Sequence, residues 1–178
     1  MKRIILAIAA GLVLASCNVK ERKQQTDSTA ENTKAVAAAE GKEAPDFTLP
    51  SSEGMTLSLS DLRGQYVVLD FWGTWCKWCV KGIPDMKAYY EKYHGMFEIL
   101  SIDVGDDEET WRQAIESYDM EWQHVITDED SADQLQQLYN IEGYPTKIVV
   151  DPMGIITKIT VGEDPAFYTY LDNLFSKK

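Results

Sequence analysis

Two cysteines three positions apart, Cys76 and Cys79, are the side chains of this chain best placed to do chemistry. They follow a run of apolar residues, and the stretch that starts at Cys76 can form a helix. Residues three apart lie on one face of a helix, close enough for two thiols to form a disulfide. The free N–H groups and the macrodipole at a helix N-terminus favour a thiolate on the first cysteine. The spacing indicates a redox-active pair, and a zinc site, a haem attachment site and a structural disulfide are the alternatives.

The residues around the pair weigh against these alternatives. Haem attachment requires a histidine directly after the second cysteine, and Val80 stands there. Zinc would need two more ligands, and only His94 and His124 are available besides carboxylates. A disulfide across so short a loop would stabilise the fold little. Gly73-Thr74-Trp75 also does not supply the proline and threonine at the set spacing that precedes a peroxidatic cysteine. We therefore expect disulfide exchange without a metal or a cofactor.

The first 17 residues indicate the compartment. Two basic residues precede an apolar stretch, residues 4–14, and the sequence Leu-Ala-Ser-Cys ends the segment at Cys17. This pattern is typical of a secretory signal peptide and is too short to span a membrane as a helix. Its end resembles the lipobox of bacterial lipoproteins, in which the cysteine is lipidated. We expect lipidation of Cys17, an anchor in the bacterial cell envelope, and a location facing the periplasm or the cell exterior.

Composition divides the chain into three parts: the signal peptide and lipobox (1–17), a tether (18–41) and a domain (42–178). Residues 18–41 contain no aromatic side chain and only two β-branched aliphatic ones, which predicts a flexible tether. Residues 42–178 suffice for one domain with its own core. The net charge of −12 becomes −14 once residues 1–16, with two basic residues and no acidic one, are removed. Such an acidic chain lacks the basic surface that nucleic-acid binding requires.

Hydrophobic periodicity predicts the elements that position the cysteines. A hairpin and further strands are expected at residues 45–49, 55–59, 66–72, 97–104, 122–127, 147–150 and 155–161. Helices are expected at residues 76–93, 106–118, 131–139 and 165–175. Pro84 should kink or break the first helix, Ser131 with Gln134 should form a capping box, and Asp164 should cap the last helix. The alternation of strands and helices implies a mixed sheet covered on both faces.

Residues 42–178 resemble thioredoxin-like proteins. The segment Val68-Leu-Asp-Phe-Trp-Gly-Thr-Trp-Cys76 matches the strand that leads to the active site, and Gly143-Tyr-Pro-Thr146 matches the cis-proline loop. The stretches 44–49 and 59–64 resemble the N-terminal extension of the TlpA/ResA group. That group comprises membrane-anchored, extracytoplasmic thiol–disulfide oxidoreductases, several of which act in cytochrome c maturation. The resemblance implies an α/β thioredoxin fold, with a mixed central β-sheet flanked by helices and an N-terminal β-hairpin extension.

The resemblance also implies roles for the catalytic residues. Cys76 would be the exposed nucleophile and Cys79 the buried resolving thiol. Asp70, an acid within an apolar strand, matches the buried aspartate that exchanges a proton with the resolving cysteine. Burial would raise the pKa of Asp70 and suit it to acid–base chemistry. An outward-facing or capping carboxylate is the alternative for this residue.

The expected substrate-binding residues surround the pair. Pro145 would be cis in a loop that faces the cysteines and pairs with an extended substrate, as in strand addition. Tyr144 would border the sulfur atoms. Trp75 and Trp78 would flank an apolar contact surface, with Trp75 the better candidate for simple packing. Lys77 would add positive potential near Cys76, and an incidental exposed lysine is the alternative.

Three positions depart from the pattern of the family. Many ResA-type proteins carry a glutamate three residues after the second cysteine, where this chain has Gly82. Thioredoxin has a lysine near its aspartate, and no lysine occurs at residues 97–104. Trp78 replaces the proline common between the cysteines. We therefore expect an acid–base apparatus nearer that of thioredoxin, but incomplete.

These features together predict an extracytoplasmic, lipid-anchored thiol–disulfide oxidoreductase that reduces protein disulfides through Cys76 and Cys79. Its expected partners are cysteine-containing protein substrates, among them clients of cytochrome c maturation, and a redox partner protein, and we expect a monomer. A thiol oxidase or disulfide isomerase, and a non-catalytic module that binds cysteine-bearing clients, are the alternatives.

Overall fold

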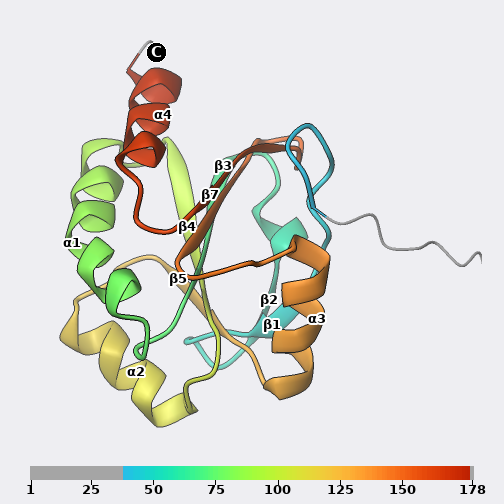
Figure 1. Ribbon diagram of the computed structural model, residues 1–178, viewed down its shortest axis with the longest axis vertical. Helices are drawn as coiled ribbons and strands as arrows, with labels where there is room; N and C mark the ends of the chain where they lie inside the picture. Colours follow the sequence, from blue (N-terminus) through green and yellow to red (C-terminus); the bar gives the residue numbers. More distant parts are fainter. Residues whose placement is uncertain (1–37, 177–178) are drawn as a thin grey trace, which may run out of the picture. The chain divides into compact units, whose positions relative to one another are not determined.

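The computed structural model describes residues 38–176, and every structural statement below concerns that part of the chain (Figure 1). The signal peptide, Cys17 and residues 18–37 of the expected tether lie outside the described residues. Within residues 38–176, no helix has both the length and the apolar character needed to cross a bilayer.

A five-stranded mixed sheet forms the centre of the domain, in the order β5-β4-β3-β6-β7. Its strands are β3 (Tyr66–Trp72), β4 (Phe97–Asp103), β5 (Gln123–Ile126), β6 (Thr146–Val150) and β7 (Ile156–Val161). β3 runs parallel to β4 and antiparallel to β6. The expected central strand at 66–72 and the mixed sheet are confirmed.

Helices cover both faces of this sheet (Figure 1). They are α1 (Lys77–Lys92), α2 (Glu108–Ser117), α3 (Glu129–Tyr139) and α4 (Pro165–Phe175). Helices α1, α2 and α4 share one hydrophobic cluster with the sheet, and α3 shares a second cluster with the N-terminal segments. Figure 1 accordingly shows α1 and α4 on one side of the sheet and α3 on the other.

The alternation of side chains along β3 decides which face receives Asp70. Val68 and Trp72 belong to the cluster under α1, and Val67, Leu69 and Phe71 belong to the opposite cluster. Successive side chains of a strand point to opposite faces. Asp70, which lies between Val68 and Trp72, therefore points to the face that α1 and the cysteines cover.

The expected N-terminal hairpin is also present. Strands β1 (Thr48–Pro50) and β2 (Thr56–Ser58) pair antiparallel, and a 3-10 turn, η1 (Leu59–Leu62), follows them. Ser51 bridges to Val125, which joins the hairpin to β5. Residues 38–41, expected in the tether, belong to the folded part: Ala38 N–H donates to the Leu138 carbonyl and Gly41 N–H to that of Ile156, both at 2.8 Å.

Helix α1 continues through Pro84 without a break, and Ile83 and Met86 on either side of it are buried in the core. The kink that we expected as the alternative to a break stays a prediction. The expected capping box of α3 was wrong. The capping box of α3 forms one turn earlier than Ser131 with Gln134. Asp128 is the N-cap and accepts from Ser131 N–H, while the Ser131 hydroxyl accepts from Asp128 N–H.

Candidate active site

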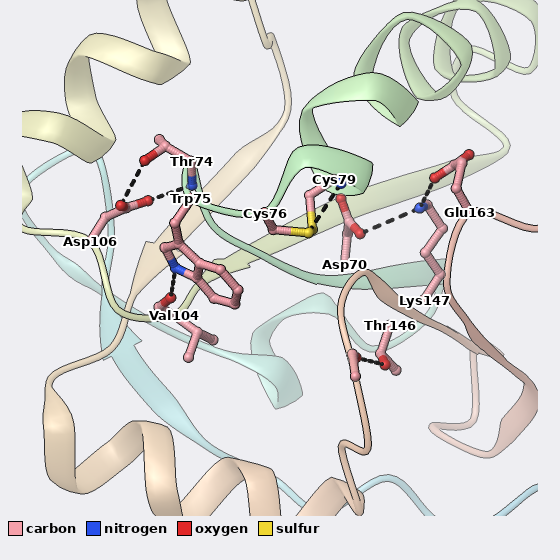
Figure 2. Close-up of a disulfide and its surroundings, with 11 residues drawn as sticks. Asp70, Thr74, Trp75, Cys76, Cys79, Val104, Asp106, Thr146, Lys147 and Glu163 are labelled. Atoms are coloured by element: carbon pink, nitrogen blue, oxygen red, sulfur yellow. Dashed lines mark hydrogen bonds and ion pairs between the residues drawn. A yellow bond between two sulfur atoms is a disulfide. The ribbon is translucent and has the colours of Figure 1, made fainter.

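Cys76 and Cys79 form a disulfide at the start of α1, with 5.2 Å between their Cα atoms (Figure 2). Cys76 is the N-cap of the helix, and its Sγ accepts a hydrogen bond from Cys79 N–H at 3.1 Å. The same N–H group and the positive end of the helix dipole would stabilise a thiolate on Cys76 after reduction. The two cysteines therefore differ in electrostatic environment, and Cys76 has the more favourable one for an anion.

Exposure does not separate the two cysteines as expected. Cys76 is 7% exposed and Cys79 5% exposed, and both belong to the hydrophobic cluster under α1. The expectation of an exposed Cys76 is wrong for the disulfide form, because its side chain belongs to the core cluster. A partner must approach through the residues that border it.

Asp70 is buried on the same side of the sheet, and Figure 2 shows its side chain directed toward the cysteine pair. Its Oδ1 atom has no hydrogen-bond partner within the described residues. Burial raises the pKa of Asp70, and the negative charge of Glu163 adds to the rise, while Lys147 opposes it. The expected raised pKa is confirmed in direction. A carboxyl group that holds its proton more tightly than usual is suited to proton exchange with a thiol.

Lys147 is the lysine near the buried aspartate that we did not find among residues 97–104. It lies directly opposite Asp70 in the antiparallel pairing of β3 with β6, and its Nζ is 3.9 Å from Asp70 Oδ1. Its side chain is only 3% exposed. The expectation of an incomplete acid–base apparatus was wrong because it considered only residues 97–104, on the other neighbouring strand. A lone lysine within the apolar run of β6 was the available signal, since a buried ammonium requires a partner.

Glu163 and Tyr168 complete this network. Lys147 Nζ donates to Glu163 Oε2 at 2.8 Å, and the Tyr168 hydroxyl donates to Glu163 Oε1 at 2.8 Å (Figure 2 shows the Lys147 contact). Glu163 lies between β7 and α4, and Tyr168 is in the first half of α4. The network therefore draws on β3, β6, α4 and the loop before α4.

Gly82 lies against this carboxylate. A Cβ atom added at Gly82 would be 2.2 Å from Glu163 Oε2, far inside van der Waals contact. Residue 82 is three positions after Cys79, on the same face of α1. Where the ResA pattern has a glutamate, this chain therefore has Gly82, and the carboxylate of Glu163, from the loop before α4, lies beside it.

The two tryptophans flank the disulfide with exposed rings. Trp75 is 55% exposed and Trp78 57% exposed. Trp75 is nonetheless fixed in place: its indole N–H donates to the Val104 carbonyl at 2.8 Å, and its ring meets that of Tyr144 edge-on at 5.2 Å (Figure 2 shows the hydrogen bond). The Tyr144–Pro145 peptide bond is cis, as expected.

The loop before Cys76 is held by Asp106, a residue that the sequence did not indicate as part of the site. The two carboxylate oxygens of Asp106 accept from the backbone N–H and the hydroxyl of Thr74, both at 2.7 Å (Figure 2). Asp103, fully buried at the end of β4, accepts from Asp106 N–H at 3.2 Å. Burial, reinforced by the neighbouring Asp106, raises the pKa of Asp103 to about 8.

Neither histidine contributes to the site. His124 is buried in β5, where its ring contacts the Met120 carbonyl at 3.2 Å, and burial lowers its pKa to about 4. Among residues 38–176, no cluster of three histidine, cysteine or acidic side chains could hold a metal ion.

Comparisons with known proteins agree with this geometry. The model of the AhpC/TSA family matches residues 40–159. The thiol-disulfide oxidoreductase ResA of Geobacillus thermodenitrificans is 37% identical over 131 residues, which cover 73% of this chain and 74% of the relative. ResA of Bacillus cereus is 35% identical over 124 residues, covering 69% of this chain and 70% of the relative. The thioredoxin domain of a thiol-disulfide oxidoreductase from Bacteroides vulgatus has a TM-score of 0.72 and 31% identity, over 78% of this chain and 99% of that one.

Proposed function

The chain belongs to the AhpC/TSA family and is a thiol–disulfide oxidoreductase, and from this premise we propose that it reduces disulfides of protein substrates through Cys76 and Cys79. The observation that carries the proposal is the position of Cys76 at the N-cap of α1, where its Sγ accepts the Cys79 N–H. A thiolate in that position is stabilised at neutral pH and can attack a disulfide.

The proposed reaction transfers two electrons from the cysteine pair to the substrate. The Cys76 thiolate attacks one sulfur of a substrate disulfide, and the other sulfur leaves and takes up a proton from water. The Asp70 carboxylate accepts the proton of the Cys79 thiol, and the resulting thiolate attacks Cys76 Sγ. The Cys76–Cys79 disulfide forms, and the second substrate sulfur leaves as a thiolate. A redox partner protein must then reduce the pair again.

The residues around the disulfide would receive the substrate. The exposed rings of Trp75 and Trp78 offer apolar area on either side of the pair. Tyr144 packs against Trp75, and Pro145 fixes the loop that we propose as the backbone partner of an extended substrate. Lys77, exposed in the first turn of α1, adds positive charge beside Cys76.

We place this activity at the bacterial cell envelope, with the domain held by lipidated Cys17 and facing the periplasm or the exterior. The signal-peptide pattern of residues 1–17 supports this location. An unfolded apocytochrome c with its pair of cysteines is the client that we propose, on the resemblance to the ResA group, and the protein would act as a monomer.

Mixed-disulfide capture tests the function. In the Cys79→Ser variant, Cys76 can still attack a substrate disulfide, but no second thiol is present to release the substrate. The variant should therefore accumulate mixed disulfides with substrate proteins, and dithiothreitol should cleave these complexes. The matched control is the double variant Cys76→Ser with Cys79→Ser, which should capture none. A client held equally well by this control would refute the enzyme and favour a binding module.

The reduction potential decides the direction of the reaction. A potential near −270 mV, the value of thioredoxin, is expected for a reductant, whereas a value near −120 mV, that of DsbA, would indicate an oxidase. Equilibration of the purified domain with glutathione buffers, followed by thiol alkylation, measures this potential.

A further inference from the structure

We propose that Glu163 is a positioning residue of the exchange reaction, which binds Lys147 and thereby sets the net charge that faces Asp70, and that Gly82 leaves the space its carboxylate occupies. This inference rests on the proposed function, because it concerns the proton that Asp70 exchanges with Cys79. It assigns a role to a residue outside the Cys-Lys-Trp-Cys segment and outside the cis-proline loop.

The distances show which of the two acids is bound to Lys147. Lys147 Nζ lies 2.8 Å from Glu163 Oε2 but 3.9 Å from Asp70 Oδ1, so only Glu163 is hydrogen-bonded to the ammonium group. Glu163 also accepts from the Tyr168 hydroxyl, whereas Asp70 Oδ1 lacks a hydrogen-bond partner within the described residues. Hydrogen bonds to a carboxylate favour its ionised form. Glu163 is therefore the acid bound to Lys147 and Tyr168, and Asp70 is the acid left without such a hydrogen bond.

The position of Lys147 between two acids makes its effect on Asp70 depend on Glu163. With Glu163 ionised, the ammonium group and the glutamate together present almost no net charge to Asp70. Without Glu163, Lys147 would face Asp70 alone and stabilise its carboxylate form. The charged or titratable groups that surround this position come from four segments: Cys76, Cys79 and Asp85 (α1), Lys147 (β6), Glu163 (the loop before α4) and Tyr168 (α4).

Gly82 shows that the position of Glu163 depends on α1. Glycine inside a helix is destabilising relative to alanine, so its presence in the second turn of α1 requires a compensating contact. The compensating contact is the glutamate: Oε2 and Cδ of Glu163 would lie 2.2 Å and 2.6 Å from any Cβ at this position. Because Cys79 is one turn earlier on the same helix face, Gly82 also lets the charged pair approach the resolving thiol.

A surface groove opens on this side of the network. Trp78, Glu163 and Tyr168 are among the residues that line it, and its volume is about 470 Å³. Trp78 is also one of the exposed rings beside the disulfide. The groove therefore connects the proposed substrate surface to Glu163, at the point where the buried network meets solvent.

Glu163→Gln tests the inference, since it keeps the shape of the side chain and removes its charge. The rate of release of the second thiol from a fluorogenic peptide disulfide should be measured in single turnovers across pH. The unneutralised Lys147 should lower the pKa of Asp70, so the rise of this rate with pH should move to lower pH by about 1 unit or more. The carboxyl carbon shift of ¹³C-labelled Asp70 should titrate lower by the same amount. Glu53→Gln, on an exposed turn far along the chain, is the matched control and should leave both titrations unchanged.

A second pair of variants tests the fit with Gly82. Gly82→Ala in the natural background should lower the Tm and displace Glu163, and therefore move the pH profile in the same direction. In a Glu163→Ala background the same substitution should raise the Tm, because alanine is the better helix former once the carboxylate is gone. An equal loss of Tm in both backgrounds would overturn the proposed fit.

The outcomes separate this inference from the function beneath it. A pH profile of Glu163→Gln that coincides with the natural protein, or moves to higher pH, would overturn the role of Glu163. Mixed disulfides on the Cys79→Ser variant would leave the function standing in that case. If Cys79→Ser captures no partner through Cys76, the proposed function fails irrespective of Glu163.

Discussion

Lys147→Met is the substitution that most directly tests the electrostatics of the buried network. It replaces an ammonium group 3.9 Å from Asp70 Oδ1 by an apolar side chain of similar length. Two unit charges about 4 Å apart interact by about 4 kcal/mol at an effective dielectric constant of 20. This corresponds to roughly 3 pH units in the pKa of Asp70, since one unit is about 1.4 kcal/mol.

The observable shift should be smaller than this upper figure, because Glu163 loses the same partner. Two acids then remain without a base, and they titrate as a coupled pair that can share one added proton. We therefore expect the pKa of Asp70 to rise by about 1–2 units. A larger share of Asp70 is then protonated at neutral pH and cannot accept the proton of Cys79, so the release of the second thiol should slow by up to about 10- to 100-fold.

The assay is the single-turnover reduction of a peptide disulfide across pH, with the two thiols released in separate phases. The first phase reports the attack by Cys76 and should change little, whereas the second should recover as pH rises. Lys158→Met is the matched control, since Lys158, on the adjacent strand β7, forms a more exposed ion pair with Glu40. A second phase with unchanged rate and pH dependence in Lys147→Met would refute the role of the ion pair.

Two further predictions concern stability and substrate contact. Asp103 has a folded-state pKa of about 8, against about 4 in an unfolded chain, so the folded state retains its proton longer. The stability that the protonated Asp103 contributes is fully present below about pH 4 and is lost, by a few kcal/mol, as the pH rises to about 8. In Asp103→Asn, the free energy of unfolding measured in urea should therefore depend less on pH between about pH 4 and pH 8. Trp78→Ala removes one exposed ring and should raise KM for a protein disulfide about 10-fold while leaving reduction of a small disulfide nearly unchanged. Trp75→Ala should slow both reactions, because it also removes the contacts to Val104 and Tyr144, and equal effects of the two variants on both substrates would contradict this distinction.

Most of the secondary structure could be predicted because its signals are local. The uninterrupted apolar run at 66–72 identified the central strand, and Asp164 followed by Pro165 identified the start of α4. The start of α3 was predicted wrongly because two local signals competed there. Asp128 and Ser131 can both cap a helix, and Asp128 prevailed because it engages the first free N–H groups while Ser131 caps it in return.

The cysteine pair, Asp70 and the cis-proline were predicted from motifs that lie within short stretches of chain. Lys147 was missed because its partnership with Asp70 depends on the register of two antiparallel strands, which no local pattern specifies. A shift by one residue would have turned Lys147 to the opposite face of the sheet. Glu163 was missed for a related reason: it lies in a loop, and only the packing of that loop on α1 brings it to Gly82.

The cost of this network explains why it is informative about function. A buried ion pair with an additional acid generally contributes less to stability than apolar residues of the same size. Asp70 is the most costly member, because burial raises its pKa and its Oδ1 finds no hydrogen bond within the described residues. A second donor, placed to satisfy that oxygen, would lower the cost and would also hold Asp70 permanently ionised. An acid that must take a proton from Cys79 and later release it requires the opposite arrangement. Lys147 is accordingly held by Glu163, close enough to influence Asp70 and too far to bind it.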